Sequence, residues 1–253
     1  ADRARPMASP HPAPLQLSCV EVATSSSDLV WQAAAEDAPA GTAFLVGEQT
    51  AGRGRRGAGW SSAQGGMYLS LLLRPSVAAD TFWGLSFVAA LAIREAMAAR
   101  LTGTDVRLKW PNDVLAGNGK ICGILLEVRG EAVVIGTGVN IAPVAALSDA
   151  KLPATSFQEL GDRTTTPEEL ARDYAGRLLQ RVAHWERDGF APVRLEWLGH
   201  CAHIGQTVRV ATGSRVIAGE FDDLGHDGAL VIRADDGTVH RVTTGDVELT
   251  GRL

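Results

Sequence analysis

The sequence predicts an α+β protein in which a mixed β-sheet flanked by helices precedes a small C-terminal β-barrel. In the first 190 residues, short β-rich runs are interspersed with long Ala- and Leu-containing helical runs. Two neighbouring β-rich runs are joined by only three residues, which makes a hairpin and excludes a purely parallel sheet. After residue 205, five short strand candidates follow one another between Gly/Asp turns, a spacing typical of a small barrel.

Composition limits the classes of function. The chain has 253 residues, 45% of them hydrophobic and 21% charged, which is typical of a globular protein and excludes disordered and fibrous classes. With 24 basic and 29 acidic residues, the net charge of -5 provides no overall field that would attract nucleic acid or an anionic membrane. Any basic site must therefore be local.

The first hundred residues contain three strand candidates and two helix candidates. The expected elements are a strand over 15–22, a helix from the serine caps at 25–27 to the alanines near 34, strands over 42–48 and 67–73, and a helix over 82–100. The longest apolar run, from Phe82 to Ile93, is interrupted by Gly84 and Ser86 and is shorter than the roughly 20 residues that span a bilayer. We therefore expect no transmembrane helix.

The middle of the chain supplies the hairpin and a well-marked helix. Strands are expected over 106–110, 121–128 and 132–139, the last two paired across residues 129–131. Thr166 is a helix cap, Pro167 takes the first helical position, and Glu169 stands where its side chain reaches back to the cap. This helix should run to about Arg187 and end at Gly189.

The expected barrel strands are 207–211, 215–221, 229–233, 239–243 and 247–250. We expect a disordered leader over residues 1–14, a main domain over 15–203 and the barrel domain over 204–253. The leader has no apolar core of the kind a signal peptide has. Three widely spaced cysteines, Cys19, Cys122 and Cys201, match neither a disulfide scaffold nor a CxxC motif, so we expect a reducing, cytoplasmic location.

The most informative motif is the segment Gly52-Arg53-Gly54-Arg55-Arg56-Gly57. Its letters fit the dinucleotide fingerprint, but the residues that follow, 58–66, are too rich in Gly and Ser to propagate the helix that fingerprint requires. Glycines allow close approach of a ligand to the backbone, and guanidinium groups pair with oxyanions. The segment therefore indicates a phosphate-binding loop that is mobile while empty, and a solvated basic loop is the alternative.

Three further motifs follow in the chain. Lys109-Trp110-Pro111-Asn112-Asp113 places polar groups at a proline turn after a strand, though it also fits an ordinary turn. Lys120 opens a buried strand that contains Gly123, although a lysine at a strand edge is commonly just solvated. In the segment from Gly136 to Asn140, glycines allow a ligand to lie on the strand and Asn140 offers both a donor and an acceptor.

In their order and spacing, these four motifs resemble those of the biotin–protein ligases, also called biotin–[acetyl-CoA-carboxylase] ligases, over about residues 15 to 253. The resemblance implies a catalytic domain related to class II aminoacyl-tRNA synthetases, followed by an SH3-like barrel. It also implies an ATP-dependent, AMP-forming enzyme. Such an enzyme converts biotin and ATP to biotinyl-5'-AMP and pyrophosphate, then transfers biotin to one lysine of a biotin carboxyl-carrier domain.

The resemblance also assigns site residues. The residues implied to be catalytic are Lys120, Arg55 and Asp113. Those implied to bind biotin are Thr24, Ser25, Ser26, Gln49, Arg53, Gly54, Arg55, Lys120 and Gly123. Those implied to bind ATP are Arg53, Arg55, Arg56, Trp60, Asn112, Lys120 and Asn140. The sequence departs from the family at Ser26, where a hydroxyl replaces an amide, and at Ala58, where many members carry another arginine.

The same resemblance implies Mg²⁺ as a companion of ATP, with no metal site made by the protein itself. Asp113 is a candidate for orienting or deprotonating the acceptor lysine, and fixing the Pro111 turn is the alternative. Only 23 residues precede Thr24, so we expect the monofunctional type without a DNA-binding domain. The expected partner is a carboxyl-carrier domain, with neither DNA nor membrane, and a homodimer stays open.

Two other functions fit the same motifs. A lipoate–protein ligase is built on the same catalytic fold, but the arginine-rich loop and the C-terminal barrel favour biotin. A non-catalytic sensor of biotin or nucleotide would keep the pocket, but Lys120, Arg53 and Arg55 are all in place. Biotin-dependent exchange of pyrophosphate with ATP separates an enzyme from a sensor.

Overall fold

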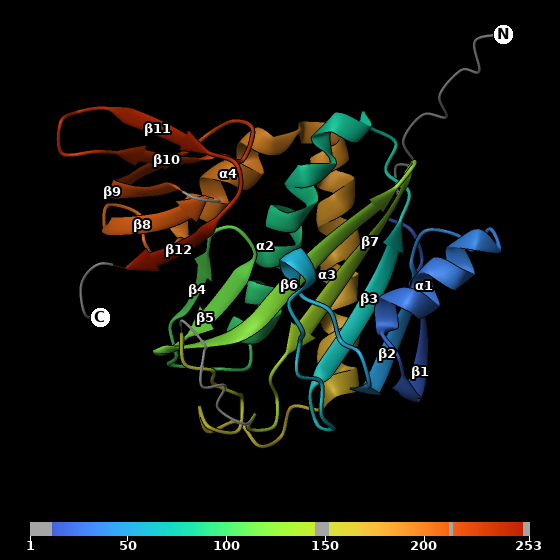
Figure 1. The fold of residues 1–253 in the computed structure, drawn as a ribbon. Helices are drawn as coiled ribbons and strands as arrows, with labels where there is room; N and C mark the ends of the chain where they lie inside the picture. The colour runs from blue at the N-terminus through green and yellow to red at the C-terminus, as the bar shows by residue number, and fades with distance from the viewer. Residues whose placement is uncertain (1–11, 145–151, 213–214, 250–253) are drawn as a thin grey trace, which may run out of the picture.

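The computed structural model describes residues 12–144, 152–212 and 215–249. In these residues the chain forms a seven-stranded sheet with helices on both faces and a second, five-stranded sheet beside it (Figure 1). This arrangement confirms the predicted α+β class. The predicted leader lies outside the described residues up to position 11, and the barrel strand predicted to end at Thr250 is described only to Leu249.

The large sheet has the strand order β1-β2-β3-β7-β6-β5-β4. Its strands are β1 (Gln16–Ala23), β2 (Thr42–Gln49), β3 (Met67–Leu73), β4 (Val106–Lys109), β5 (Asp113–Ala116), β6 (Gly119–Arg129) and β7 (Ala132–Val139). Strand β1 runs parallel to β2 and every other neighbouring pair is antiparallel, so the sheet is mixed. The predicted hairpin is confirmed, with Arg129 opposite Ala132 and Gly130 at a φ of 59° in the turn.

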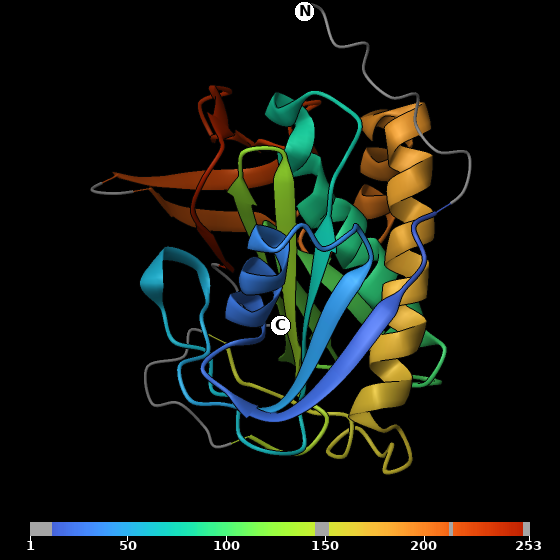
Figure 2. The same ribbon diagram turned by 90° about the vertical axis from the view of Figure 1, so that its right-hand side faces the viewer.

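Helices cover the two faces of this sheet unequally (Figure 2). Helices α2 (Leu85–Ala98) and α3 (Pro167–Asp188) pack on one face, and the shorter α1 (Ser26–Ala35) packs on the other. Alternation along β7 sends Ile135 and Val139 toward α2 and α3, while Val134 packs with Trp31 of α1. Because α1 is short, it covers only part of its face and leaves the rest open.

The α3 start is as predicted, with a complete capping box at Thr166 and Glu169. One strand and one α-helix were not predicted. Of strand β5 only Asp113 belongs to the predicted proline turn, and helix α4 (Phe190–Gly199) directly follows Gly189, which has a φ of 74°. Pro192 lies in the first turn of α4, where a missing N–H costs nothing, so proline marks a helix start rather than a break here.

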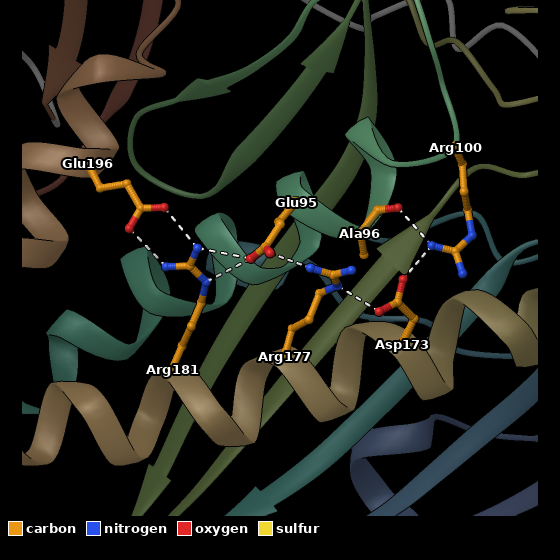
Figure 3. A network of polar contacts seen from close by, with 7 residues as sticks. All are labelled: Glu95, Ala96, Arg100, Asp173, Arg177, Arg181 and Glu196. Carbon is orange, nitrogen blue, oxygen red and sulfur yellow. Dashed lines mark hydrogen bonds and ion pairs between the residues drawn. The ribbon is translucent and has the colours of Figure 1, made fainter.

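Ion pairs link the helices on the face of the large sheet that α2 and α3 cover (Figure 3). The Glu95 carboxylate of α2 accepts hydrogen bonds from Arg177 and Arg181 of α3, and Arg181 also donates to Glu196 of α4 at 2.8 Å. Arg177 and Arg100 both pair with Asp173, the latter at 2.5 Å. Within this network every guanidinium faces a carboxylate, so the cluster clamps the three helices together.

The short helical turn η2 (Ala79–Gly84) leads into α2. By length and composition alone the combined stretch Ala79–Ala98 could cross a bilayer. However, 67% of its most apolar 18-residue window is buried inside the fold. Ten residues of α2 itself are buried, among them Phe87, Leu91 and Ile93. The apolar character of this stretch is thus accounted for by the core of the protein.

The second sheet is antiparallel with the order β11-β10-β9-β8-β12. Its strands are β8 (Thr207–Thr212), β9 (Arg215–Leu224), β10 (Leu230–Arg233), β11 (Val239–Val242) and β12 (Asp246–Leu249). Phe221 and Ile232 are fully buried between this sheet and the rest of the core. Arg194 of α4 pairs with Asp223 of β9, and Trp110 donates to the Gly228 carbonyl at 3.0 Å, so the small sheet is tied to the large one.

Candidate active site

A cavity of about 240 Å³ opens on the face of the large sheet that α1 leaves uncovered. Along β7, Ala132 and Val134 lie beneath α1, whereas Gly136 and Gly138 on the same face lie beyond its end and line the cavity. Strand β3 repeats this pattern, with Leu72 under α1 and Tyr68 and Ser70 in the cavity. The start of α1 therefore forms one wall of the site.

One end of the cavity is a cluster of hydroxyl and amide groups. Ser25 caps α1, and the Gln49 Oε1 accepts hydrogen bonds from the Ser26 N–H at 2.8 Å and from its hydroxyl at 3.1 Å. The Ser70 hydroxyl lies 2.8 Å from that of Ser26 and 3.1 Å from that of Ser27. Neutral donors and acceptors held this closely suit a polar, uncharged group of a ligand.

Tyr68 belongs to the same wall, and its hydroxyl donates to the Ala63 carbonyl at 2.8 Å. Burial raises the pKa of Tyr68 to about 12, so the phenol stays protonated at neutral pH. On the other side of Gln49, its Nε2 donates to the Ser62 hydroxyl at 2.8 Å. Both amide atoms of Gln49 are thus occupied, which fixes the orientation of the amide plane.

The opposite end of the cavity holds a carboxylate between two lysines. Asp113 lies 2.7 Å from the Lys120 ammonium and 3.6 Å from that of Lys109. Lys109 is buried, and burial lowers its pKa despite the neighbouring carboxylate. Lys120 is the more exposed of the two lysines and lines the cavity, so it can reach a bound anion.

A β-bulge aims Lys120 into the cavity. Val114 pairs with Cys122 but the next residue, Leu115, pairs with Lys120, so Ile121 is an extra residue in β6. In an unbroken strand Lys120 and Gly123 would point to opposite faces, because they are three residues apart. The extra residue restores the phase and places both on the cavity face.

The arginine-rich segment crosses the mouth of the cavity as a loop with a short helical turn, η1 (Arg55–Gly57). Arg53 pairs with Asp28 of α1 at 2.7 Å and lies 3.7 Å from Glu127 of β6. Arg55 donates to the Asn112 side chain at 3.2 Å. Burial lowers the Arg55 pKa, yet a guanidinium stays charged at neutral pH, so the loop brings positive charge to the cavity.

Trp60 lies at the end of this loop and covers two opposed glycines. Gly123 and Gly138 are partners across β6 and β7, and a Cβ built on them would meet the indole ring at 2.7 Å and 2.5 Å. Only glycine lets the ring lie this close to the sheet. The Lys120 ammonium stands 5.2 Å from the ring centroid, so Trp60 also contacts the cationic end of the site.

Most of the predicted site residues line this one cavity. They are Ser25, Ser26, Gln49, Arg53, Gly54, Arg55, Arg56, Trp60, Asn112, Asp113, Lys120 and Gly123. Thr24 is exposed and is not part of the lining. The Asn140 side chain is also outside it and donates instead to the Thr155 carbonyl at 3.0 Å and the Lys120 carbonyl at 3.4 Å. Asn140 thus ties β6 to the segment near Thr155.

Sequence reasoning did not single out Ser27, Tyr68, Ser70 or Asp246, all of which line the cavity. The alternation of Tyr68 and Ser70 with buried leucines in β3 is a signal that could have revealed a polar patch on one face. Asp246 belongs to the small sheet and carries no motif. No local pattern indicates that it lies opposite a loop almost 200 residues earlier.

Comparison with known proteins agrees with this geometry. Residues 19–140 match the model of the biotin/lipoate A/B protein ligase family, and residues 203–250 match that of the biotin protein ligase C-terminal domain. These matches assign the fold and its cavity to the ligases that join biotin or lipoate to a protein. The second match favours biotin over lipoate, because its model describes biotin protein ligases.

Curated relatives make the assignment specific. The chain is 38% identical to the biotin–[acetyl-CoA-carboxylase] ligase of Paracoccus denitrificans over 207 residues, covering 76% of this chain and 84% of the relative. It is 33% identical to the ligase of the same name from Mycobacterium tuberculosis, covering 90% and 86%. The chain therefore belongs to the biotin–protein ligase family.

Solved structures show the same fold with ligands. Biotin protein ligase from Aquifex aeolicus in complex with biotin and ATP superimposes with a TM-score of 0.81 at 25% identity, covering 93% of this chain and 99% of that one. The ligase from Leishmania major in complex with biotinyl-5-AMP gives 0.67 at 25% identity, covering 92% and 100%. The predicted family, fold and enzyme class are confirmed.

Proposed function

We propose that this ligase joins biotin to ATP in the cavity described above, forming biotinyl-5'-AMP and pyrophosphate, and then transfers biotin to a lysine of a biotin carboxyl-carrier domain. The observation that carries the proposal is the division of one cavity into two ends. The cluster of Ser26, Ser70 and Gln49 suits the neutral ureido ring of biotin. Lys120 and the loop arginines suit its carboxylate and the phosphates of ATP.

In the first step, a carboxylate oxygen of biotin attacks the α-phosphorus of ATP and the bond to the β-phosphate breaks. Both partners are negatively charged, so the barrier includes their repulsion. Lys120, held by Asp113 at 2.7 Å, and Arg55, held by Asn112 at 3.2 Å, would neutralise that charge from fixed positions. Fixed cations also spare the reorganisation that water would need.

In the second step, the neutral amine of the acceptor lysine attacks the acyl carbon, the bond from that carbon to the phosphate oxygen breaks, AMP leaves with the electron pair, and the amine proton passes to water. Asp113 is already occupied by Lys109 and Lys120, so we assign it the positioning of Lys120 rather than removal of the amine proton. The arginine loop with Trp60 lies over the cavity, where it would shield the acyl phosphate from water. Loss of this shield would release the intermediate.

Mg²⁺ would enter as part of the substrate Mg-ATP. In the described part of the chain, no group of three or more His, Cys, Asp or Glu could hold a metal ion by itself. A magnesium ion bound mainly by phosphates needs only one or two carboxylates from a protein. We also propose a cytoplasmic location, which the three free cysteines support, and a reaction that involves neither DNA nor a membrane.

The deciding experiment is exchange of labelled pyrophosphate into ATP, followed by transfer to a carrier domain. Exchange should depend on biotin, and mass spectrometry should show a single biotinylated lysine on the carrier. Lipoate in place of biotin is the matched control and should support little exchange. Exchange that depends on lipoate, or that does not depend on either acid, would exclude the proposed reaction.

A further inference from the structure

The cavity receives one carboxylate from outside the large sheet and its helices. Asp246, the first residue of β12, lines the cavity and places its Oδ1 3.8 Å from the Arg55 Nη1. In the cavity lining that the structure describes, it is the one residue contributed by the small sheet. A carboxylate at a site for phosphates is unfavourable by itself, so its position needs a reason.

The turn before β12 holds the arginine loop at two further points. The Gly245 carbonyl accepts from the Arg55 Nη1 at 3.4 Å. The Thr244 hydroxyl accepts from the Arg56 Nη2 at 2.7 Å. Residues 244–246 therefore hold the arginine loop in place. They lie at the start of β12 in the small sheet, whereas strands of the large sheet form the floor of the cavity.

The charge of Asp246 also fits the environment of Arg55. The Arg55 side chain is 27% exposed, so its guanidinium has lost much of its contact with water. Its Nη1 already faces the neutral Asn112 amide at 3.2 Å, and Asp246 adds the carboxylate nearest to it in the described contacts. A nearby carboxylate offsets the hydration that a partly buried guanidinium loses, so it stabilises the guanidinium in that position.

We propose that Asp246 is a positioning residue for Arg55, through which the C-terminal sheet sets the affinity of the enzyme for ATP. The carboxylate holds the Arg55 guanidinium over the cavity before the nucleotide arrives, so binding does not have to order the loop. The proposal rests on the assignment of the cavity to biotin and ATP. It adds that the small sheet acts on the site through one ion pair.

The test compares Asp246→Asn with Asp222→Asn and with the wild-type protein. Asp222 pairs with Arg233 in the same small sheet, away from the cavity, and therefore controls for loss of an ion pair in that sheet. Asp246→Asn should raise the KM for ATP about two- to fivefold, as the loss of a half-exposed ion pair does, with a smaller change in kcat. Asp246→Glu should restore most of the affinity.

A second measurement needs no substrate. Trypsin cleaves after arginine, and in the ligand-free protein the loop of Asp246→Asn should be cut after Arg53, Arg55 and Arg56 several times faster than in Asp222→Asn. Unchanged cleavage, or faster cleavage with an unchanged or lower KM for ATP, would overturn the proposal. A lower KM would mean that Asp246 merely competes with the phosphates.

These readouts separate the two proposals. If the wild-type protein shows no biotin-dependent exchange, the proposed reaction fails, whereas the cleavage rates still report whether Asp246 holds the loop. A double variant with Arg55→Ala completes the cycle. The cleavage rate of Arg55→Ala/Asp246→Asn should match that of Arg55→Ala alone if the carboxylate acts through Arg55, and independent, multiplying effects would overturn the proposal.

Discussion

Two clusters of charged side chains in this protein use the same chemistry for different ends. The helical cluster drawn in Figure 3 sets Arg100, Arg177 and Arg181 against Glu95, Asp173 and Glu196, three charges of each sign. Counted in the same way, the cavity lining and its ion-pair partners have five cations, Arg53, Arg55, Arg56, Lys109 and Lys120, and four carboxylates, Asp28, Asp113, Glu127 and Asp246. The helical cluster is balanced, whereas the cavity keeps a surplus of one positive charge.

This difference separates structural from functional charge. A balanced network satisfies its own hydrogen bonds and needs no ligand, so its contribution is to hold helices in place. A cavity with a surplus of cations has unbalanced positive charge until an anion binds. Each loop arginine is held by a partner from a different part of the chain. The number of arginines therefore does not identify a ligand site. An excess of cations over neighbouring carboxylates does.

The largest expected effect is at the unbalanced cluster. Lys120→Ala should slow single-turnover adenylation roughly 10- to 150-fold, because one charge-assisted contact to the reacting groups is worth about 1.5 to 3 kcal/mol. Stability to urea should change little, since the Lys120 side chain is 30% exposed and Asp113 keeps Lys109 as a partner. Arg172→Ala, which removes an exposed pair with Glu168 on α3, is the control and should leave adenylation unchanged. Normal adenylation by folded Lys120→Ala would contradict the role of Lys120.

Asn140 tests whether a residue outside the cavity contributes to stability rather than to nucleotide binding. Its amide joins the Lys120 and Thr155 carbonyls and is 5% exposed. Asn140→Ala leaves these acceptors without that donor, so the free energy of unfolding should fall by about 1 to 3 kcal/mol. Urea denaturation measures this loss. A variant of normal stability with a raised KM for ATP would show that Asn140 acts on the nucleotide directly.

The balanced cluster should give the opposite pattern. Glu95→Gln removes the carboxylate shared by Arg177 and Arg181, and the free energy of unfolding should fall by about 1 kcal/mol, because the pairs are partly exposed. The kinetic constants for biotin and ATP should stay within twofold of wild type. If Glu95→Gln slows adenylation strongly while the protein stays folded, the two clusters are coupled and the comparison fails.

Lowering the pH should reduce the stability that the helical cluster provides, by less than the Glu95→Gln substitution does. The hydrogen bond from Arg181 lowers the Glu196 pKa, and for Asp173 the hydrogen bonds from Arg100 and Arg177 outweigh burial, so its pKa is also lowered. A lowered folded-state pKa gives stability that is present above the unfolded value, about 4, and is lost as the pH falls through the folded value.

Urea denaturation at a series of pH values from 6 to 3 tests this effect. Between pH 4.5 and 3 the stability of wild type should decrease more steeply than that of Glu196→Gln, because the variant has no carboxylate to protonate. Parallel profiles for the two proteins would mean that Glu196 contributes nothing to the acid sensitivity.

Several features of the fold and site follow from the sequence alone because their causes are local. The capping box at Thr166 and the hairpin turn at Gly130 are each fixed by neighbouring residues. Motif order then identifies the family, and most of the residues it implicates line one cavity. Helix α4 was missed because Gly189 was expected only to end the preceding helix, and strand β5 was missed because it begins directly after the Pro111 turn.

Only the tertiary structure decides which side chains meet. The bulge at Ile121 turns Lys120 toward the cavity, and it is visible only in the pairing of β5 with β6. The family resemblance implicates Thr24 and Asn140, yet both lie outside the cavity lining, and Asp246 lies in it without belonging to a motif. Strand register and the packing of one sheet against another depend on contacts between distant residues, so no local pattern encodes them.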